Sequence, residues 1–276
     1  MIKKNTSCFR IRMMCRLLSV SPSGYYHWLK NPGSRRSQEN KRLTQVIKRA
    51  FDKEKARAGA IRITKRLHAE GENVGKNRVA KLMKANGWRA KAAKRFKVTT
   101  HSNHTLPVAP NLLDRQFSAS KMNEKWVSDI TYLWTTEGWL YLAVVMDLYS
   151  RKIVGWALSE RMTVTLTMDA LRMALSQRNK PKQVILHSDR GSQYCAKAYQ
   201  DLLNDHKLIC SMSKRGDCYD NAAMESWNHS FKVEAIHGEK LKTCDETKQE
   251  VFEYIEVYYN RKRLHSTLGY VSPEMF

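Results

Sequence analysis

The sequence predicts a mixed α/β core preceded by a basic all-α region, and three observations support this. Residues 126–158 contain three strand-like stretches in succession, after which helix-like and strand-like stretches alternate. Residues 1–90 instead show apolar side chains at helical spacing between polar turns. Residues 1–120 hold 28 Lys and Arg against 6 Asp and Glu, whereas residues 121–276 hold 21 against 20. A basic front of this kind is typical of a nucleic-acid-binding segment joined to a part with another task.

Residues 1–34 are expected to contain two short helices. Met14, Leu17 and Leu18 have the spacing of one helix face, and Pro22 lies in a polar turn before an aromatic-rich second helix. These are the proportions of a helix-turn-helix.

Residues 35–90 form a second predicted helix-turn-helix-like unit. Val79 and Met83 belong to the apolar stripe of a helix over about 76–86. The basic side chains that this stripe leaves facing outward are Lys76, Arg78, Lys81 and Lys84. We expect this helix to contact DNA phosphates, and the alternative is the solvated charged face of an ordinary helical bundle. For the basic front as a whole, the alternatives are a merely solubilising surface or a ribosome-associated protein.

Residues 91–120 are predicted to be a basic linker, because a polar run and two prolines leave little to bury. His101 and His104 form a His-x-x-His pattern, but no matching cysteine pair follows, so a solvated linker is favoured over a zinc finger. The six cysteines form no Cys-x-x-Cys pair, and we expect reduced thiols in the cytoplasm. The longest apolar run, Trp139–Met146, is too short to span a membrane.

Residues 121–276 predict the elements of the α/β core in order. The expected elements are strands near 126–135, 139–147 and 152–158, a helix near 163–177, a strand near 184–188, a helix near 196–206, a strand near 208–212, and helices near 220–235 and 244–260. This pattern fits an α/β sandwich without choosing its family.

Three acidic residues have distinctive contexts in this core. Asp129 falls inside the first strand, Asp189 follows the fourth strand beside a Gly turn, and Glu225 lies on a helix. Between the first pair lie 59 residues, and between the second pair 35. Carboxylates are the hard oxygen ligands that Mg²⁺ requires, so three converging carboxylates predict metal-dependent phosphoryl transfer.

Several longer strings surround these acids. They are Trp126–Tyr132, His187–Tyr194, Asp220–Ser226, Tyr259–His265 and the carboxyl-terminal Gly269–Phe276. With these strings, residues 121–276 resemble the integrase core of bacterial insertion-sequence transposases, specifically the second reading frame of the insertion-sequence-3 family, which is related to retroviral integrases. Asp129, Asp189, Glu225 and the basic Lys232, seven positions further on, match the catalytic pattern of that family.

The resemblance implies a ribonuclease H-like fold, with a mixed five-stranded sheet and flanking helices behind a helix-turn-helix region. It implies a DDE-type DNA transposase whose three carboxylates hold two Mg²⁺ ions, or Mn²⁺ in their place. Such an enzyme cleaves DNA at the element ends to release a 3′-OH and joins that 3′-OH to a new phosphodiester.

The same resemblance implies several partners. They are insertion-sequence ends and target DNA, at least one further copy of the chain on DNA, and a protein from the upstream reading frame. The expected location is the bacterial cytoplasm, at the nucleoid, with no membrane partner.

Further residues are assigned around the three acids. Predicted DNA contacts are Lys232, Lys214 and Arg215. Predicted supporting residues are His187, Gln193 and Asn221. Asp147 is either a fourth metal carboxylate or, as we favour, a turn-capping residue. The carboxyl-terminal residues that either bind DNA or lock the last helix onto the core are Asn260, Arg261, Arg263 and His265.

Two other functions stay open from the residues alone. A non-catalytic DNA-binding regulator would use the same basic front, but it has no need for the three acids. A ribonuclease H-type hydrolytic nuclease would share the fold and the metals, and strand-transfer products distinguish a transposase from it.

Overall fold

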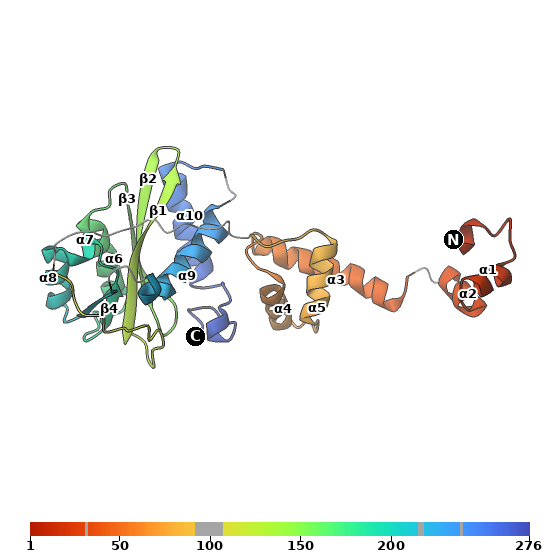
Figure 1. Cartoon of the computed structure of the whole chain (residues 1–276), viewed down its shortest axis with the longest axis horizontal. Coiled ribbons are helices and arrows are strands. Elements are labelled where there is room, and N and C mark those ends of the chain that lie inside the picture. The colour runs from red at the N-terminus through yellow and green to blue at the C-terminus, as the bar shows by residue number, and fades with distance from the viewer. Residues whose placement is uncertain (31–32, 92–106, 215–217, 238–239) are drawn as a thin grey trace. The chain divides into compact units, whose positions relative to one another are not determined.

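Five strands form one mixed sheet in the computed structural model, which describes residues 1–30, 33–91, 107–214, 218–237 and 240–276 (Figure 1). In sheet order the strands are β3 (Ile153–Ser159), β2 (Gly138–Asp147), β1 (Lys125–Thr135), β4 (Ile185–Ser188) and β5 (Ile209–Met212). The pairs β1–β2 and β2–β3 are antiparallel, whereas β1–β4 and β4–β5 are parallel. The predicted mixed five-stranded sheet is confirmed.

Helices cover both faces of this sheet (Figure 1). One face packs against α6 (Val164–Gln177), α7 (Ser192–Cys195) and α8 (Lys197–Asp205). The other face packs against α9 (Ala222–Phe231), the π-helix η3 (Lys232–Ile236), α10 (Cys244–Phe252) and the π-helix η4 (Glu253–Tyr259). Two short 3₁₀ helices, η2 (Cys218–Asn221) and η5 (Ser266–Leu268), complete this part. None of the helices that the structure describes is long and apolar enough to cross a bilayer.

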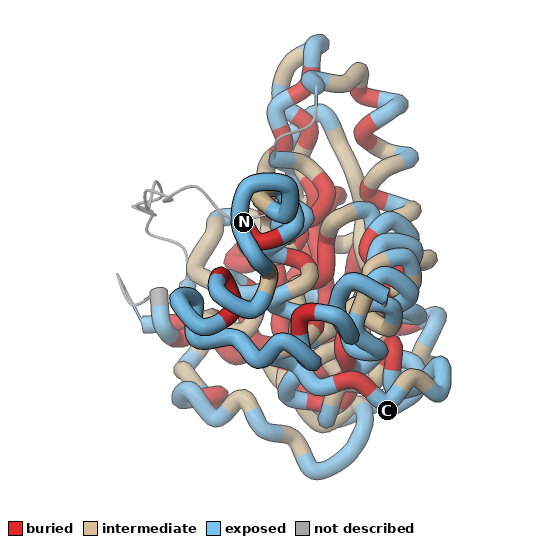
Figure 2. The backbone as a smooth tube through the Cα atoms, turned by 90° about the vertical axis from the view of Figure 1, so that its right-hand side faces the viewer, coloured by how far each residue is buried: buried red, intermediate tan, exposed pale blue. Residues whose placement is uncertain are grey.

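The interior strand β2 is buried along most of its length, as its continuous apolar run predicts. Figure 2 shows how burial varies along the backbone. At the neighbouring β3, Gly155 lets α6 approach closely, because an added Cβ would lie 2.1 Å from the carbonyl oxygen of Ala170. The sheet is therefore held tightly against α6 on one side.

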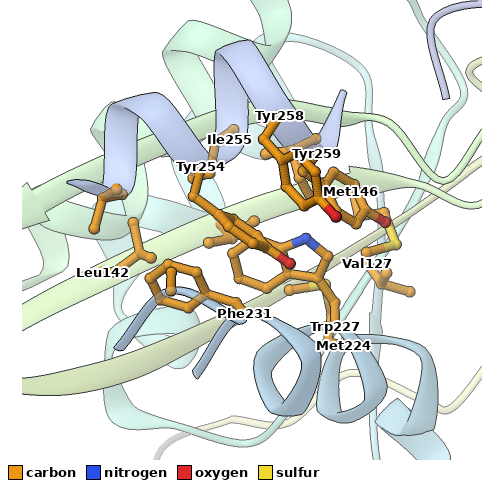
Figure 3. Close-up of a cluster of buried hydrophobic side chains, with 14 of the residues drawn as sticks. Val127, Leu142, Met146, Met224, Trp227, Phe231, Tyr254, Ile255, Tyr258 and Tyr259 are labelled. Carbon is orange, nitrogen blue, oxygen red and sulfur yellow. The ribbon is translucent and has the colours of Figure 1, made fainter. Parts of the chain in front are cut away.

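An aromatic cluster holds α9 against η4 on the opposite face. Trp227 stacks on Phe231 with ring centroids 5.2 Å apart, and it meets Tyr259 edge to face at 6.0 Å. Figure 3 shows these α9 rings reaching toward Tyr254 and Tyr259 of η4. Because this cluster is fully buried, it determines which face of α9 turns toward β1.

The carboxyl-terminal segment is locked onto the core through two polar side chains. Asn260 accepts a hydrogen bond from the Ile153 amide (2.9 Å) and donates one to the Ile153 carbonyl (3.0 Å). Arg263 donates two hydrogen bonds to buried Glu234, at 2.9 and 3.0 Å. Of the two roles left open for these residues, the structure shows the locking role, whereas Arg261 pairs with Glu274 at the surface.

The contacts within the chain separate a unit of Met1–Ala90 from a unit of Lys91–Phe276. In the first unit, the 3₁₀ helix η1 (Ile2–Lys4) and the helices α1 (Ile11–Leu17) and α2 (Pro22–Lys30) enclose a small core. The members of that core are Ile2, Met14, Cys15 and Tyr25.

A second core in this unit lies between α3 (Arg35–Lys53), α4 (Ala60–Ala69) and α5 (Lys76–Ala85). Val79 and Met83 of α5 are buried in it, as the apolar stripe predicts. The turn after α4 contains Gly71 with φ +86°, a left-handed conformation that favours glycine.

Residues 107–120 differ from the predicted linker, because part of them packs onto the α/β core. Leu113 is buried in the core, and the amides of Leu112 and Leu113 donate to the Ser211 hydroxyl at 2.9 and 3.2 Å. The prediction that this stretch has little to bury is wrong here, since the Leu113 side chain is buried in the core and the amides of Leu112 and Leu113 bind Ser211 on β5. His101 and His104 lie outside the described residues.

Candidate active site

Asp129 and Asp189 are brought together by the register of two parallel strands. Val127 of β1 pairs with His187 of β4, and each acid lies two residues further along its own strand direction. Neighbouring strands are about 4.8 Å apart, so this register places the two carboxylates side by side at the carboxyl end of β4. Ligands in α/β sheets commonly bind at such an end.

The turn after β4 holds the Asp189 carboxylate. The Gly191 amide donates to Asp189 Oδ1 at 2.9 Å. A Cβ at Gly191 would lie 3.0 Å from the same oxygen, which leaves little room for any other residue. The neighbouring Arg190 donates to the Ser213 carbonyl at 2.6 Å and ties the turn to the end of β5.

Glu225 reaches the same region from the first turn of α9. One face of α9 is buried against the sheet through Met224, Trp227 and Phe231. The helix face next to it, which carries Glu225, is therefore directed toward β1. On that face Asn228 donates to Asp129 Oδ2 at 2.7 Å. This bond links α9 directly to the strand that carries the first acid.

The electrostatics show how closely the three acids interact. Burial raises the pKa of Asp129 well above its usual value, and the nearby charges of Asp189 and Glu225 raise it further. Hydrogen bonds from the Ile130 amide and from Asn228 oppose this pKa shift. Burial also raises the pKa of Glu225. A cation placed among these carboxylates would relieve their mutual repulsion.

The donor set fits a divalent cation that is completed by other ligands. Within the described ranges, no three His, Cys, Asp or Glu side chains enclose a metal ion by themselves. Mg²⁺ is commonly held by one or two carboxylates, with water and substrate phosphates filling its shell. Adjacent oxygen donors on Asp129 and Asp189, with Glu225 across from them, suit that kind of site.

Lys232 lies one helical turn beyond Asn228, where α9 passes into the π-helix η3. Its Nζ lies 4.5 Å from the centroid of the Tyr132 ring. Burial lowers the pKa of Lys232, and the negative charge of Asp129 opposes that shift. A cationic side chain is thus held beside the carboxylates. π-helical turns of this kind often occur at functional sites.

The three predicted supporting residues make different contacts. Asn221 donates to the Ser128 carbonyl at 3.3 Å, which ties the start of α9 to β1, although its side chain does not cap the helix. Gln193 donates to the Met162 carbonyl at 3.1 Å. The ring nitrogens of His187 lie 2.9 and 3.1 Å from the hydroxyls of Ser211 and Ser213. His187 therefore joins β4 to β5 beneath the site.

His187 predicts a specific pH dependence of stability. Burial lowers its pKa to about 4 from the usual 6.5, against an opposing effect of Asp220. The unfolded chain therefore binds more protons between these pH values, and the free energy of unfolding falls as the pH falls through this window. The shift corresponds to about 3 kcal/mol. In urea unfolding without metal, the free energy of unfolding of His187→Gln should fall less than that of wild type between about pH 7 and about pH 4.5. An equal fall in both proteins would contradict a contribution of His187 to the pH dependence.

The other predicted basic residues are placed unequally. Lys214 is exposed and pairs with Asp114 at 3.6 Å, while Arg215 lies outside the described residues. On α5, the exposed lysines are Lys76, Lys81 and Lys84. Arg78 does not face outward as predicted, because its guanidinium donates to Asn40 Oδ1 at 2.9 and 2.8 Å and joins α5 to α3.

Asp147 is a turn residue, the role favoured from the sequence. Its carboxylate accepts hydrogen bonds from the amides of Tyr149 (3.0 Å) and Asn123 (3.2 Å), and Arg178 lies 3.4 Å away. These contacts occupy both of its oxygens and stabilise the end of β2.

Sequence reasoning missed the role of two residues at the site. Asn228 shares a helix face with Glu225 by its spacing, but its bond to Asp129 depends on how α9 docks on β1. Tyr194 is buried beneath the acids, with its hydroxyl 3.0 Å from Ser128 Oγ. The charges of Asp129 and Asp189 contribute to raising its pKa. No local signal marks a buried tyrosine as a neighbour of a carboxylate site.

Models of known protein families match both parts of the chain. Family models described as integrase core domain match residues 119–218 and 225–276, and an HTH-like domain model matches residues 38–96. The integrase catalytic core of HTLV-2 in complex with magnesium has a TM-score of 0.41 at 15% identity, and the match covers 55% of this chain and 95% of that chain.

Two relatives extend over nearly the whole chain. Transposase InsF for insertion sequence IS3A of Escherichia coli K12 is 48% identical over 277 residues, which cover 100% of this chain and 96% of the relative. The 31 kDa protein of insertion element IS600 of Shigella sonnei is 45% identical over 263 residues, covering 95% and 97%.

An integrase core behind an HTH-like domain defines a polynucleotidyl transferase that acts on DNA, and integrase cores are metal-dependent. The chain belongs to the IS3-family transposases.

Proposed function

We propose that Asp129, Asp189 and Glu225 are the catalytic carboxylates of this transposase and that they hold two divalent cations, Mg²⁺ or Mn²⁺. The enzyme cleaves DNA at the ends of its insertion sequence to release a 3′-OH and joins that 3′-OH to a phosphodiester of the target. The observation that supports this best is the pKa of Asp129, which desolvation and the nearby charges of Asp189 and Glu225 all raise. Three carboxylates are thereby gathered where repulsion favours a bound cation.

Different residues of the site hold the cations, orient the carboxylates and neutralise the charge of the DNA phosphate. Bound divalent cations would polarise the phosphodiester and stabilise the charge on the attacking and leaving oxygens. Asp129 and Asp189 provide adjacent oxygen donors from two strands, and Asn228 fixes the orientation of the Asp129 carboxylate. Lys232, held beside Tyr132, places a positive charge where a DNA phosphate would lie.

The proposed function is tested by Glu225→Gln, assayed with a labelled duplex that carries the element end, in Mg²⁺ or Mn²⁺. We expect cleavage and joining to fall about 100-fold or more, with DNA binding retained, because one metal-binding carboxylate is lost. Glu160→Gln is the matched control, since Glu160 is an exposed acid remote in sequence from the triad.

The products distinguish the proposed reaction from simple hydrolysis. Labelled 3′ ends joined covalently to a second duplex indicate strand transfer, whereas shortened free strands alone indicate a hydrolytic nuclease. Equal activity of Glu225→Gln and wild type would show that Glu225 is not catalytic.

We also propose that α5 contacts DNA through Lys76, Lys81 and Lys84. Each lysine that neutralises a phosphate contributes about 0.9 to the slope of log affinity against log salt. Lys81→Ala/Lys84→Ala should therefore weaken binding at low salt and reduce that slope by about 2. Fluorescence anisotropy over a salt series measures both quantities. Lys41→Ala, at an exposed lysine of α3, is the control. An unchanged slope would exclude both lysines as phosphate contacts.

Pairing two element ends requires at least two active sites, so we propose that two or more copies of the chain assemble on DNA. A protein from the upstream reading frame is a further proposed partner. Oligomer formation on DNA would place one carboxylate site at each end that is cut.

A further inference from the structure

Three aromatic side chains form a continuous row on the β1–β2 hairpin, and we call this row the aromatic ladder: Tyr132, Trp139 and Trp134. Trp134 pairs directly with Trp139 across the two strands, and Tyr132 lies two residues before Trp134 on the same face. Leu133 and Leu140, which alternate with them, point into the core. The register therefore directs the whole ladder outward.

The rings of the ladder contact one another and are open to solvent. The rings of Trp134 and Trp139 meet edge to face at 4.6 Å, and those of Tyr132 and Trp139 at 5.2 Å. Trp134 is 52% exposed and Trp139 46% exposed. A cross-strand pair of this kind does stabilise a hairpin. Hairpin stability alone does not explain why two large indoles are about half exposed, because exposing their apolar surface to water costs more free energy than exposing small side chains.

One end of the ladder lies beside Lys232 of the candidate active site. Tyr132 comes three residues after Asp129 on β1, so the two side chains leave the strand on opposite faces of the sheet. Lys232 connects the two faces: its Nζ lies 4.5 Å from the centroid of the Tyr132 ring, and Asn228, one turn before it, donates to Asp129. From Tyr132 the ladder continues to two exposed indoles about 7 Å further along the strand.

The charges around the hairpin turn favour an anionic occupant. The Thr136 amide donates to the Lys242 carbonyl at 2.9 Å, which brings the segment from Lys240 to Lys242 beside the turn. Lys240 is exposed. The acid of the turn, Glu137, accepts a hydrogen bond from the Cys244 amide at 2.6 Å and is thereby directed toward the start of α10.

We propose that the aromatic ladder is a stacking platform for unpaired DNA bases beside the phosphate that the carboxylates act on. This rests on the proposed function, because it assumes that DNA lies at Asp129. Every base has a π face, so stacking on Trp134 and Trp139 is independent of sequence, while Lys232 meets the phosphate of the same strand. The platform holds a strand whose end has separated from its complement, so that its phosphodiester, beside Lys232, reaches the three acids.

The test compares binding of two labelled duplexes to the full chain in EDTA, one with a flush end and one with a short unpaired extension. We expect wild type to prefer the extension by about 10-fold, from one or two stacked bases. Trp134→Leu/Trp139→Leu, which keeps apolar groups on the hairpin, should bind both duplexes alike. Trp134→Phe retains a π face and should retain the preference. Trp28→Leu, at an exposed Trp of α2, is the matched control.

A second measurement locates the contact. An extension carrying 5-iodouracil should crosslink on irradiation to Trp134 or Trp139, identified by peptide mass. An unchanged preference in the double Leu variant, or crosslinks confined to other residues, would overturn the proposal. If the double Leu variant without DNA differs in molar mass from wild type but keeps the preference for the extension, the ladder is an interface between copies of the chain, and the proposal is overturned.

Binding in EDTA requires no catalysis, so the binding assay tests the aromatic ladder independently of the proposed catalytic function. Loss of the extension preference in the variant with cleavage intact supports the ladder. A wild type that prefers the extension but never cleaves would contradict the proposed function alone.

Discussion

Asp129→Asn should reduce cleavage and strand joining by about 1,000-fold or more while raising the thermal stability of the metal-free protein. Desolvation and the charges of its neighbours Asp189 and Glu225 raise the pKa of Asp129. Asparagine removes one charged metal ligand, and a loss of about 4 kcal/mol of transition-state stabilisation corresponds to about 1,000-fold. The same change removes repulsion in the absence of metal, and each kcal/mol so relieved raises the unfolding midpoint by roughly 2–4 °C.

The pH dependence of this stability gain has a definite sign. A raised pKa means that folded Asp129 binds its proton more tightly than the unfolded chain does. The resulting stability is present at low pH and is lost as the pH rises through the folded pKa. The difference in unfolding midpoint between Asp129→Asn and wild type should therefore grow with pH.

Calorimetry with and without Mg²⁺ separates the two effects. Added Mg²⁺ should raise the midpoint of wild type but hardly that of Asp129→Asn, because only a bound ligand stabilises the fold. Asp201→Asn, at an exposed acid of α8, is the control and should change neither quantity. If Asp129→Asn destabilises the metal-free protein and keeps its response to Mg²⁺, Asp129 is a structural residue rather than a metal ligand.

Arg263→Met should destabilise the α/β unit by about 3–5 kcal/mol, the typical cost of leaving one charge of a buried pair without its partner. Arg263 holds Glu234 through two hydrogen bonds, and the Tyr254 hydroxyl donates to the same carboxylate at 2.9 Å. Methionine keeps the apolar stem of the side chain but removes the positive charge that faces Glu234. Because Glu234 belongs to η3, the loss should also disturb the turn that carries Lys232.

Chemical denaturation of single and double variants tests this explanation. Glu234→Gln/Arg263→Met should recover much of the lost free energy of unfolding, because the buried negative charge of Glu234 is removed together with the positive charge of Arg263. Arg261→Met, at the exposed neighbour that pairs with Glu274, should change stability by less than about 1 kcal/mol. If the double variant has as low a free energy of unfolding as Arg263→Met, the lost interaction between Arg263 and Glu234, rather than the remaining buried charge of Glu234, causes the destabilisation.

Much of the α/β unit could be predicted because its signals are local. Period-two alternation marks β1, a continuous apolar run marks β2, and the observed elements lie close to their predicted ranges. The helix predicted near 220–235 is interrupted, since η3 begins at Lys232 with a bond from the His237 amide to the Lys232 carbonyl. Local propensity does not report that change, which accompanies the burial of Glu234 against Arg263.

By itself, the sequence determined the order of strands and helices, the basic front and the positions of the three acids, because these depend on periodicity, composition and motif. Only the tertiary structure decided which side chains meet across elements. It turned Arg78 inward onto Asn40, buried Leu113, and brought Asn228 to Asp129. It also ran the aromatic ladder from Lys232 out to solvent. Such contacts arise when strand register and helix docking join residues far apart in the chain, and no local pattern encodes that docking.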